Sequence, residues 1–240
     1  MSASTWDRRI ARAESLAGVS AAAAELLKFY AQIARLQKSI YEEIGRQAHL
    51  DPSLLAPYFA QLLALVRRIG PPALVEAAGE LAGEDLLRTP SQEAHVFFGR
   101  ALLQPYTELL AHRSGTPRGH APSTCPFCGE KPSVGVLREE GDGGKRSLIC
   151  SLCSTEWEFR RVLCPGCGEE ALDKLPVYTA SEFESVRVEA CDTCHTYIKS
   201  VDLTRNGLAV PVVDELATIP LNLWAEESGY RKLQLNLLGM

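Results

Sequence analysis

The sequence predicts an α+β protein: an N-terminal all-α helical domain, two tandem modules that each hold four cysteines, and a C-terminal helix. In the first half of the chain, apolar residues recur every three or four positions, as on one face of a helix. The second half contains short alternating strands, frequent turns and all eight cysteines of the 240 residues. The expected boundaries are 1–118, 119–162, 163–211 and 212–240.

The N-terminal half is expected to contain four helices. They span Ser20–Gln47, Leu54–Ile69, residues 73–82 and Ser91–His112. Ser20 and Ser91 are the expected N-caps. Asp51 followed by Pro52 marks the start of the second helix, and Gly70 marks its end. Pro105 is expected to kink or split the fourth helix. Residues 113–123, rich in Gly, Pro and Ser, are the expected linker.

The eight cysteines form four Cys-x-x-Cys pairs, with none left over. Such a turn places two thiolates on one side of a tight loop, so two facing turns complete a four-sulfur site with no open position. An internal repeat, with offsets of 39 residues (125 to 164) and 41 residues (150 to 191), pairs the turns in sequential order. The expected ligands of the first site are Cys125, Cys128, Cys150 and Cys153, and those of the second are Cys164, Cys167, Cys191 and Cys194.

Two other uses of the cysteines fit the pattern less well. Disulfides suit secreted scaffolds, and residues 1–15 show no apolar segment of the kind found in secretory signals. A redox-active Cys-x-x-Cys sits once, before a helix, whereas these four pairs lie among strands and turns. The modules are therefore expected to be rubredoxin-like or of zinc-ribbon type. Four thiolates suit either zinc or a single iron, and the ligands alone leave both metals open.

The strands and the tail can be placed from turn signals and alternation. Val134–Leu137 and Ser147–Ile149 flank a Gly-rich turn and predict a hairpin. Asn206-Gly207 predicts a second hairpin, which would join the strand 195–203 to residues 208–210. The tail is expected to be a helix that begins at Asp214, bends at Pro220 and docks on the helical domain or between the domains.

Charge and motif content exclude several classes of function. The chain carries a net charge of −5, and residues 121–200 hold nine Lys and Arg against thirteen Asp and Glu. Binding to nucleic acid needs a basic face, so no nucleic-acid partner is expected. No run of 18 apolar residues occurs, so no membrane insertion is expected. No nucleophile–base constellation stands out, so the protein is not expected to be an enzyme.

Several motifs together resemble those of the formate dehydrogenase accessory protein family, the FdhE proteins. They are CPxCG at Cys125, CSLC-x-T-x-W from Cys150 to Trp157, VLCPGCG from Val162 to Gly168, the last cysteine pair with Thr196-Tyr197-Ile198-Lys199, and the tail Asp214-Glu215-Leu216-Ala217-Thr218 with Glu226, Gly229 and Tyr230. The resemblance implies a cytoplasmic assembly chaperone that binds the catalytic subunit of a formate dehydrogenase and assists its maturation. It also implies two rubredoxin-type iron ions, with zinc possible instead. The alternative is a rubredoxin-like iron protein for electron transfer or oxygen sensing. The oligomeric state stays open.

Overall fold

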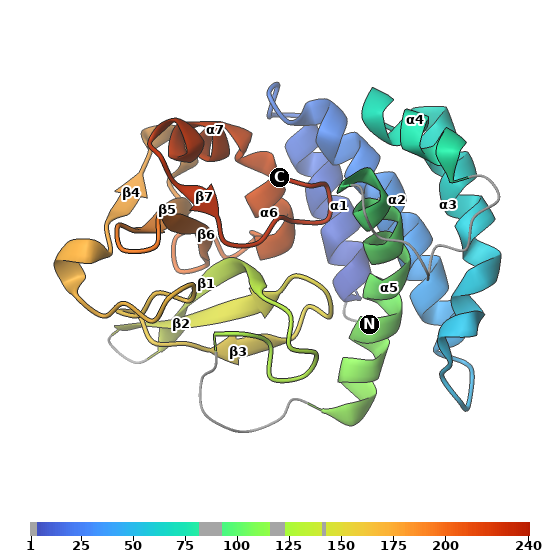
Figure 1. The fold of residues 1–240 in the computed structure, drawn as a ribbon, viewed down its shortest axis with the longest axis horizontal. Coiled ribbons are helices and arrows are strands. Elements are labelled where there is room, and N and C mark those ends of the chain that lie inside the picture. The colour runs from blue at the N-terminus through green and yellow to red at the C-terminus, as the bar shows by residue number, and fades with distance from the viewer. Residues whose placement is uncertain (1–3, 82–92, 116–122, 141–142) are drawn as a thin grey trace.

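The computed structural model of the chain describes residues 4–81, 93–115, 123–140 and 143–240. A group of helices lies beside a mixed β-sheet, and the short helix α6 lies between them (Figure 1). The helices of the first half are α1 Thr5–Ala17, α2 Ala24–Ile44, α3 Ala56–Ile69, α4 Pro72–Glu80 and α5 Glu93–Ser114. An α+β fold with an all-α N-terminal half is therefore present, as the sequence predicts.

α1 lies ahead of the first helix expected from apolar periodicity. Ser4 caps it, because the Ser4 Oγ accepts a hydrogen bond from the Asp7 backbone N–H at 3.1 Å while Asp7 Oδ2 accepts one from the Ser4 N–H at 3.3 Å. Serine and an acidic residue three positions later are the sequence signal of such a capping box. Ser20 does not cap the next helix, which was a wrong prediction: α2 begins at Ala24, after a turn.

α5 is one continuous helix through Pro105, so of the predicted kink or split the split does not occur. Proline lacks the N–H that would bond the carbonyl four residues earlier, which is that of Ala101. Gln37 Nε2 on α2 donates to this carbonyl at 2.9 Å, so the group is satisfied from a neighbouring helix. The expected N-cap Ser91 and most of the expected linker lie outside the described residues.

The sheet belongs to the second half of the chain. Its strands are β1 Pro132–Glu140, β2 Gly143–Cys150, β3 Glu156–Glu158, β4 Val177–Thr179, β5 Val186–Cys191, β6 Thr196–Asp202 and β7 Arg231–Lys232. The order is β3-β2-β1-β6-β5-β4, with β7 beside β6. β1 and β6 pair in parallel, so strands from both cysteine-bearing segments form one continuous sheet. A Cβ on Gly135 would lie 2.2 Å from Ser200 Oγ and 3.2 Å from Ser200 Cβ, so a larger residue here would force Ser200 to shift.

The tail differs from the expectation in two respects. Residues 208–210 form no strand, because Asn206 Oδ1 accepts from the Leu208 N–H and the chain turns directly into α6 Pro211–Ala217. The single expected tail helix is two helices, α6 and α7 Ile219–Glu227. The break falls at Thr218, two residues before Pro220, which fits the second position of α7. Asp214 lies inside the first turn of α6, not at its N-cap.

Three apolar clusters hold these parts together. The largest joins the helices α1 to α5 with Val213, Leu216 and Ala217 of α6. A second covers one part of the sheet with Leu221 and Ala225 of α7. The third includes Trp157, Phe159 and cysteines of the first group, with Ala111 of α5. In the described part of the chain, no helix is both long and apolar enough to cross a membrane.

Candidate metal centres

Each cysteine pair lies in a tight turn whose next residue has a left-handed backbone. Gly129 and Gly168 follow two of the pairs, with φ of 79° and 81°. Ser154 and His195 follow the other two, with φ of 55° and 52°. Glycine adopts this conformation freely, whereas other residues do so at a cost. Ser154 and His195 occupy equivalent positions of the two repeats, so in both repeats the geometry of the turn outweighs the preference of these residues for negative φ.

Backbone hydrogen bonds close the two Cys-Pro-x-Cys-Gly turns in the same way. The Gly129 N–H donates to the Cys125 carbonyl at 2.9 Å, and the Gly168 N–H donates to the Cys164 carbonyl at 3.0 Å. Backbone N–H groups also approach the sulfurs: Phe127 N lies 3.4 Å from Cys125 Sγ, and Gly166 N lies 3.3 Å from Cys164 Sγ. Such donors stabilise thiolate over thiol.

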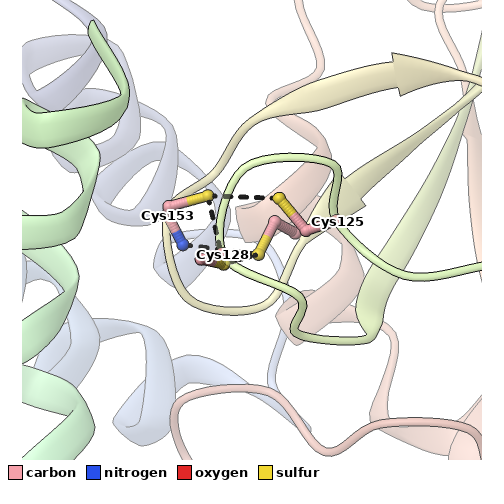
Figure 2. A group of neighbouring side chains, drawn as sticks. Cys125, Cys128 and Cys153 are labelled. Carbon is pink, nitrogen blue, oxygen red and sulfur yellow. Dashed lines mark hydrogen bonds between the residues drawn. The ribbon is translucent and has the colours of Figure 1, made fainter. Parts of the chain in front are cut away.

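The structure brings the eight sulfurs together in two groups of four. The first group is Cys125, Cys128, Cys150 and Cys153, and the second is Cys164, Cys167, Cys191 and Cys194. These are the two groups that the sequence repeat pairs. All eight cysteines are free, and in each group the sulfurs lie within 4.8 Å of one another. Figure 2 shows Cys125, Cys128 and Cys153 of the first group turned toward one another beside α5.

The sulfur spacing fits a tetrahedral metal ion. Metal–sulfur bonds of about 2.3 Å give tetrahedral edges of about 3.8 Å. In the first group, Cys125 and Cys153 are 3.5 Å apart and Cys128 and Cys150 are 3.4 Å apart. In the second, the separations from Cys164 to Cys194 and from Cys167 to Cys191 are both 3.7 Å. Four sulfurs occupy every corner, so such a site would serve structure or one-electron chemistry rather than substrate binding.

A threonine hydroxyl contacts one sulfur in each group. Thr155 Oγ1 lies 3.1 Å from Cys153 Sγ, and Thr196 Oγ1 lies 3.0 Å from Cys194 Sγ. Burial raises the pKa of Cys194, but hydrogen bonds from Thr196 lower it, and the pKa falls to about 7. Each threonine stands two residues after the second cysteine of its pair, in CSLCST and CDTCHT. The threonine therefore recurs at the same position in both repeats, and a search restricted to cysteine ligands does not find it.

The two groups differ in exposure. Three of the four cysteines in the first group are buried, whereas Cys167 in the second is exposed and Cys194 is half-buried. α5 covers the first group: Gln104 Nε2 donates to the Ser151 carbonyl at 3.0 Å, and Arg100 bonds Glu130 at 2.7 Å. These contacts tie the loops of the first group to the helical half. Neither Arg100 nor Gln104 was singled out from the sequence.

The tail motif has two parts: Asp214 and Glu215 lie at the junction of helices and sheet, whereas the Tyr230 hydroxyl donates to Asp192 in the loop of the last cysteine pair at 2.5 Å. Lys199 of β6 is fully buried, and its Nζ lies 3.0 Å from Glu215 Oε1 and donates to the Glu215 carbonyl at 2.6 Å. Lys232 bonds the same carboxylate, and Asn236 Nδ2 donates to it at 2.8 Å. Burial opposes ionisation of Glu215, but the two ammonium groups outweigh it and lower its pKa to about 2. Arg12 of α1 holds Asp214 through both carboxylate oxygens, at 2.5 and 3.0 Å.

Models of two FdhE domains match the second half of the chain. The FdhE central domain matches residues 124–161, and the FdhE C-terminal domain matches residues 162–238. Together these segments contain every cysteine of both groups and the tail motif.

Relatives described as FdhE homologues extend the match. The chain is 40% identical to one from Aquifex aeolicus over 116 residues, which cover 48% of this chain and 41% of that protein. It is 32% identical to one from Edwardsiella ictaluri over 197 residues, which cover 73% of this chain and 63% of that protein. The chain thus spans about half the length of the curated relatives it matches.

A solved structure shares the whole fold. The crystal structure of the FdhE protein from Pseudomonas aeruginosa superposes with a TM-score of 0.76 at 25% identity, covering 99% of this chain and 97% of that one. The resemblance read from the sequence motifs is therefore confirmed over both halves of the chain. With its paired four-cysteine groups on one sheet and its matching domains, the chain belongs to the FdhE family.

Proposed function

We propose that the protein is a cytoplasmic, non-enzymatic accessory factor that assists maturation of a formate dehydrogenase by binding its catalytic subunit. Family membership carries this proposal, since the matched segment holds both four-cysteine groups. We further propose that the eight cysteines ligate two metal ions, rubredoxin-type iron in the first instance, with zinc as the other metal that the sulfurs suit.

The geometry supports a platform for another polypeptide. The two sulfur groups lie on one continuous sheet, so two bound ions would brace neighbouring strands and loops. α5 docks on the loops of the first group, which would couple that ion to the position of the helical half. Structural metal in small modules contributes on the order of 10–16 kcal/mol to folding at neutral pH, enough to hold such a surface rigid.

Capture of the catalytic subunit tests the proposal. Tagged, metal-loaded protein is incubated with extract of cells that produce the formate dehydrogenase, and bound proteins are quantified by mass spectrometry. The catalytic subunit should be enriched, and a Cys150→Ser variant should lose the enrichment because the first group also organises the α5 contact. The tag alone serves as the background. Equal recovery with the tag alone would contradict the proposal.

The exposure of Cys167 favours a second candidate, an electron-transfer or oxygen-sensing role for iron at the second group. An exposed thiolate ligand shortens the path for electrons or oxygen to the ion. Elemental analysis and a visible spectrum of protein purified without oxygen distinguish the candidates. Two irons with the absorption of a ferric tetrathiolate would support it. Zinc-only protein that still raises formate dehydrogenase activity in cells would eliminate it.

A further inference from the structure

A small cavity lies beside the second four-cysteine group and is lined by residues of β2, β4, β5 and β6. Its volume is about 50 Å³, room for a few water-sized atoms. Its walls include Cys164 and Cys191 on one side and apolar side chains such as Leu163, Leu175 and Ile198 elsewhere. Three arginines also line it: Arg146, Arg161 and Arg187. Apolar walls with a few convergent polar groups are typical of a ligand site.

Charged side chains gather around the cavity. Among the described residues, Glu189 is the only carboxylate that lines it, and it is shared by two arginines: Arg146 at 2.6 Å and Arg187 at 2.6 Å. Arg161 forms no ion pair with any described residue and donates only to the Gly144 carbonyl, at 3.3 Å. Three guanidinium groups therefore line the cavity with one carboxylate and the sulfurs of Cys164 and Cys191.

Arg146 is a buried part of the cavity wall. Its side chain is 2% exposed, and its Nε has no hydrogen-bond partner among the described residues. Its other nitrogens are engaged, with Nη1 donating to the carbonyls of Arg160 at 3.0 Å and Leu163 at 3.2 Å. These contacts hold the guanidinium group at the cavity wall, although its Nε is too deeply buried to reach a molecule in the cavity.

From this cluster of guanidinium groups around a small, partly open cavity, we propose that the cavity binds a small oxyanion, either free phosphate or sulfate or the carboxylate of a larger molecule. Guanidinium groups match the planar and tetrahedral faces of such anions with paired hydrogen bonds. The apolar walls strengthen these contacts because they lower the local dielectric. The cavity volume excludes a whole nucleotide and admits only the anionic group. The site joins β2 and β5, and so it bridges the two cysteine-bearing segments.

The rival explanation is that the arginines only offset the negative charge of a metal-bound tetrathiolate. Arg161 and its neighbour Arg160 separate the two explanations. Arg160 is exposed, pairs with Glu170 at 2.7 Å and does not line the cavity. Arg161→Gln therefore removes a charge from the cavity, while Arg160→Gln removes the same charge one residue away and serves as the matched control.

Isothermal titration of the metal-loaded full chain with phosphate, sulfate and acetate, against chloride at constant ionic strength, provides the test. Saturable binding of at least one oxyanion is expected, with at least tenfold weaker binding in Arg161→Gln and unchanged binding in Arg160→Gln. Preference for acetate would identify a carboxylate, and preference for phosphate or sulfate a tetrahedral anion. No saturable binding with a Kd of about 1 mM or tighter, or equal losses in both variants, would overturn the proposal. Elemental analysis of each variant shows whether the second ion is retained, so failure here is separate from failure of the proposed function.

Discussion

The junction carboxylate Glu215 permits a quantitative test of what holds the sheet to the helices. Glu215→Gln keeps the size of the side chain and removes the charge that faces Lys199 and Lys232, both almost fully buried. Removing one partner of a buried ion pair costs about 3–5 kcal/mol, because the remaining charge is left uncompensated. The free energy of unfolding of a typical domain is about 5–15 kcal/mol, so the variant should lose a large share of it.

Urea unfolding of metal-loaded protein, followed by far-ultraviolet circular dichroism, measures this loss. Lys199→Met and the double variant with Glu215→Gln complete a cycle. The double variant should be at least about 1 kcal/mol more stable than the sum of the two single changes, because Lys199→Met removes one of the two ammonium groups that Glu215→Gln leaves uncompensated. Glu25→Gln, which breaks an exposed pair with Lys28, is the control and should change stability by less than about 0.5 kcal/mol. A loss below 1 kcal/mol for Glu215→Gln, or simple additivity, would refute the reasoning.

Three further predictions concern the same elements. Burial lowers the pKa of Lys199 from 10.5 to about 8 despite the attraction of Glu215, so the folded protein releases this proton at a lower pH than the unfolded chain. The free energy of unfolding therefore rises with pH between these two pKa values. From pH 8 to 9.5, the wild type should gain about 1.5 kcal/mol relative to Lys199→Met in urea unfolding. If the difference between the two proteins stays the same at both pH values, the lowered pKa of Lys199 is contradicted. Gly129→Ala should lower the free energy of unfolding by about 0.5–1 kcal/mol, and Ser154→Gly should raise it by a similar amount, because both positions have positive φ. A Cβ on Gly129 meets no atom within 4 Å, so a steric clash would not contribute. If thermal unfolding shifts in the same direction for both variants, backbone strain is not the cause. A coloured chelator should remove metal in two phases, and the faster phase should come from the group that contains the exposed Cys167. Cys167→Ser should lose this faster phase. Release of both ions in a single phase would show that exposure of the cysteines does not set the rate of metal loss.

Local spacing explains which parts of the fold could be predicted. Four Cys-x-x-Cys pairs in a repeat predict which sulfurs meet, because the turn and the intervening strands are built from residues close in sequence. Alternation likewise predicts the buried side of β5, where Val186 and Val188 lie inside and Arg187 lies between them. The same reasoning was wrong for the hairpin at Asn206, since a turn signal does not say whether a strand or a helix follows it.

Long-range partners explain what could not be predicted. Pro105 interrupts a helix in isolation, but Gln37, 68 positions away in the chain (105 minus 37), bonds the carbonyl that proline leaves free. Lys199 reads as an ordinary polar residue of a strand, and its burial follows from Glu215 and Lys232 meeting it from the tail. The parallel pairing of β1 with β6 likewise depends on Gly135 meeting Ser200.

By itself, the sequence determined the α+β class, the grouping of eight sulfurs into two fours and the family, because each depends on spacing within short segments. Tertiary structure decided that both groups share one sheet, that α5 buries the first while the second stays open, and that three arginines converge beside it. Burial and charge balance are properties of what packs against a residue, and no local pattern encodes that.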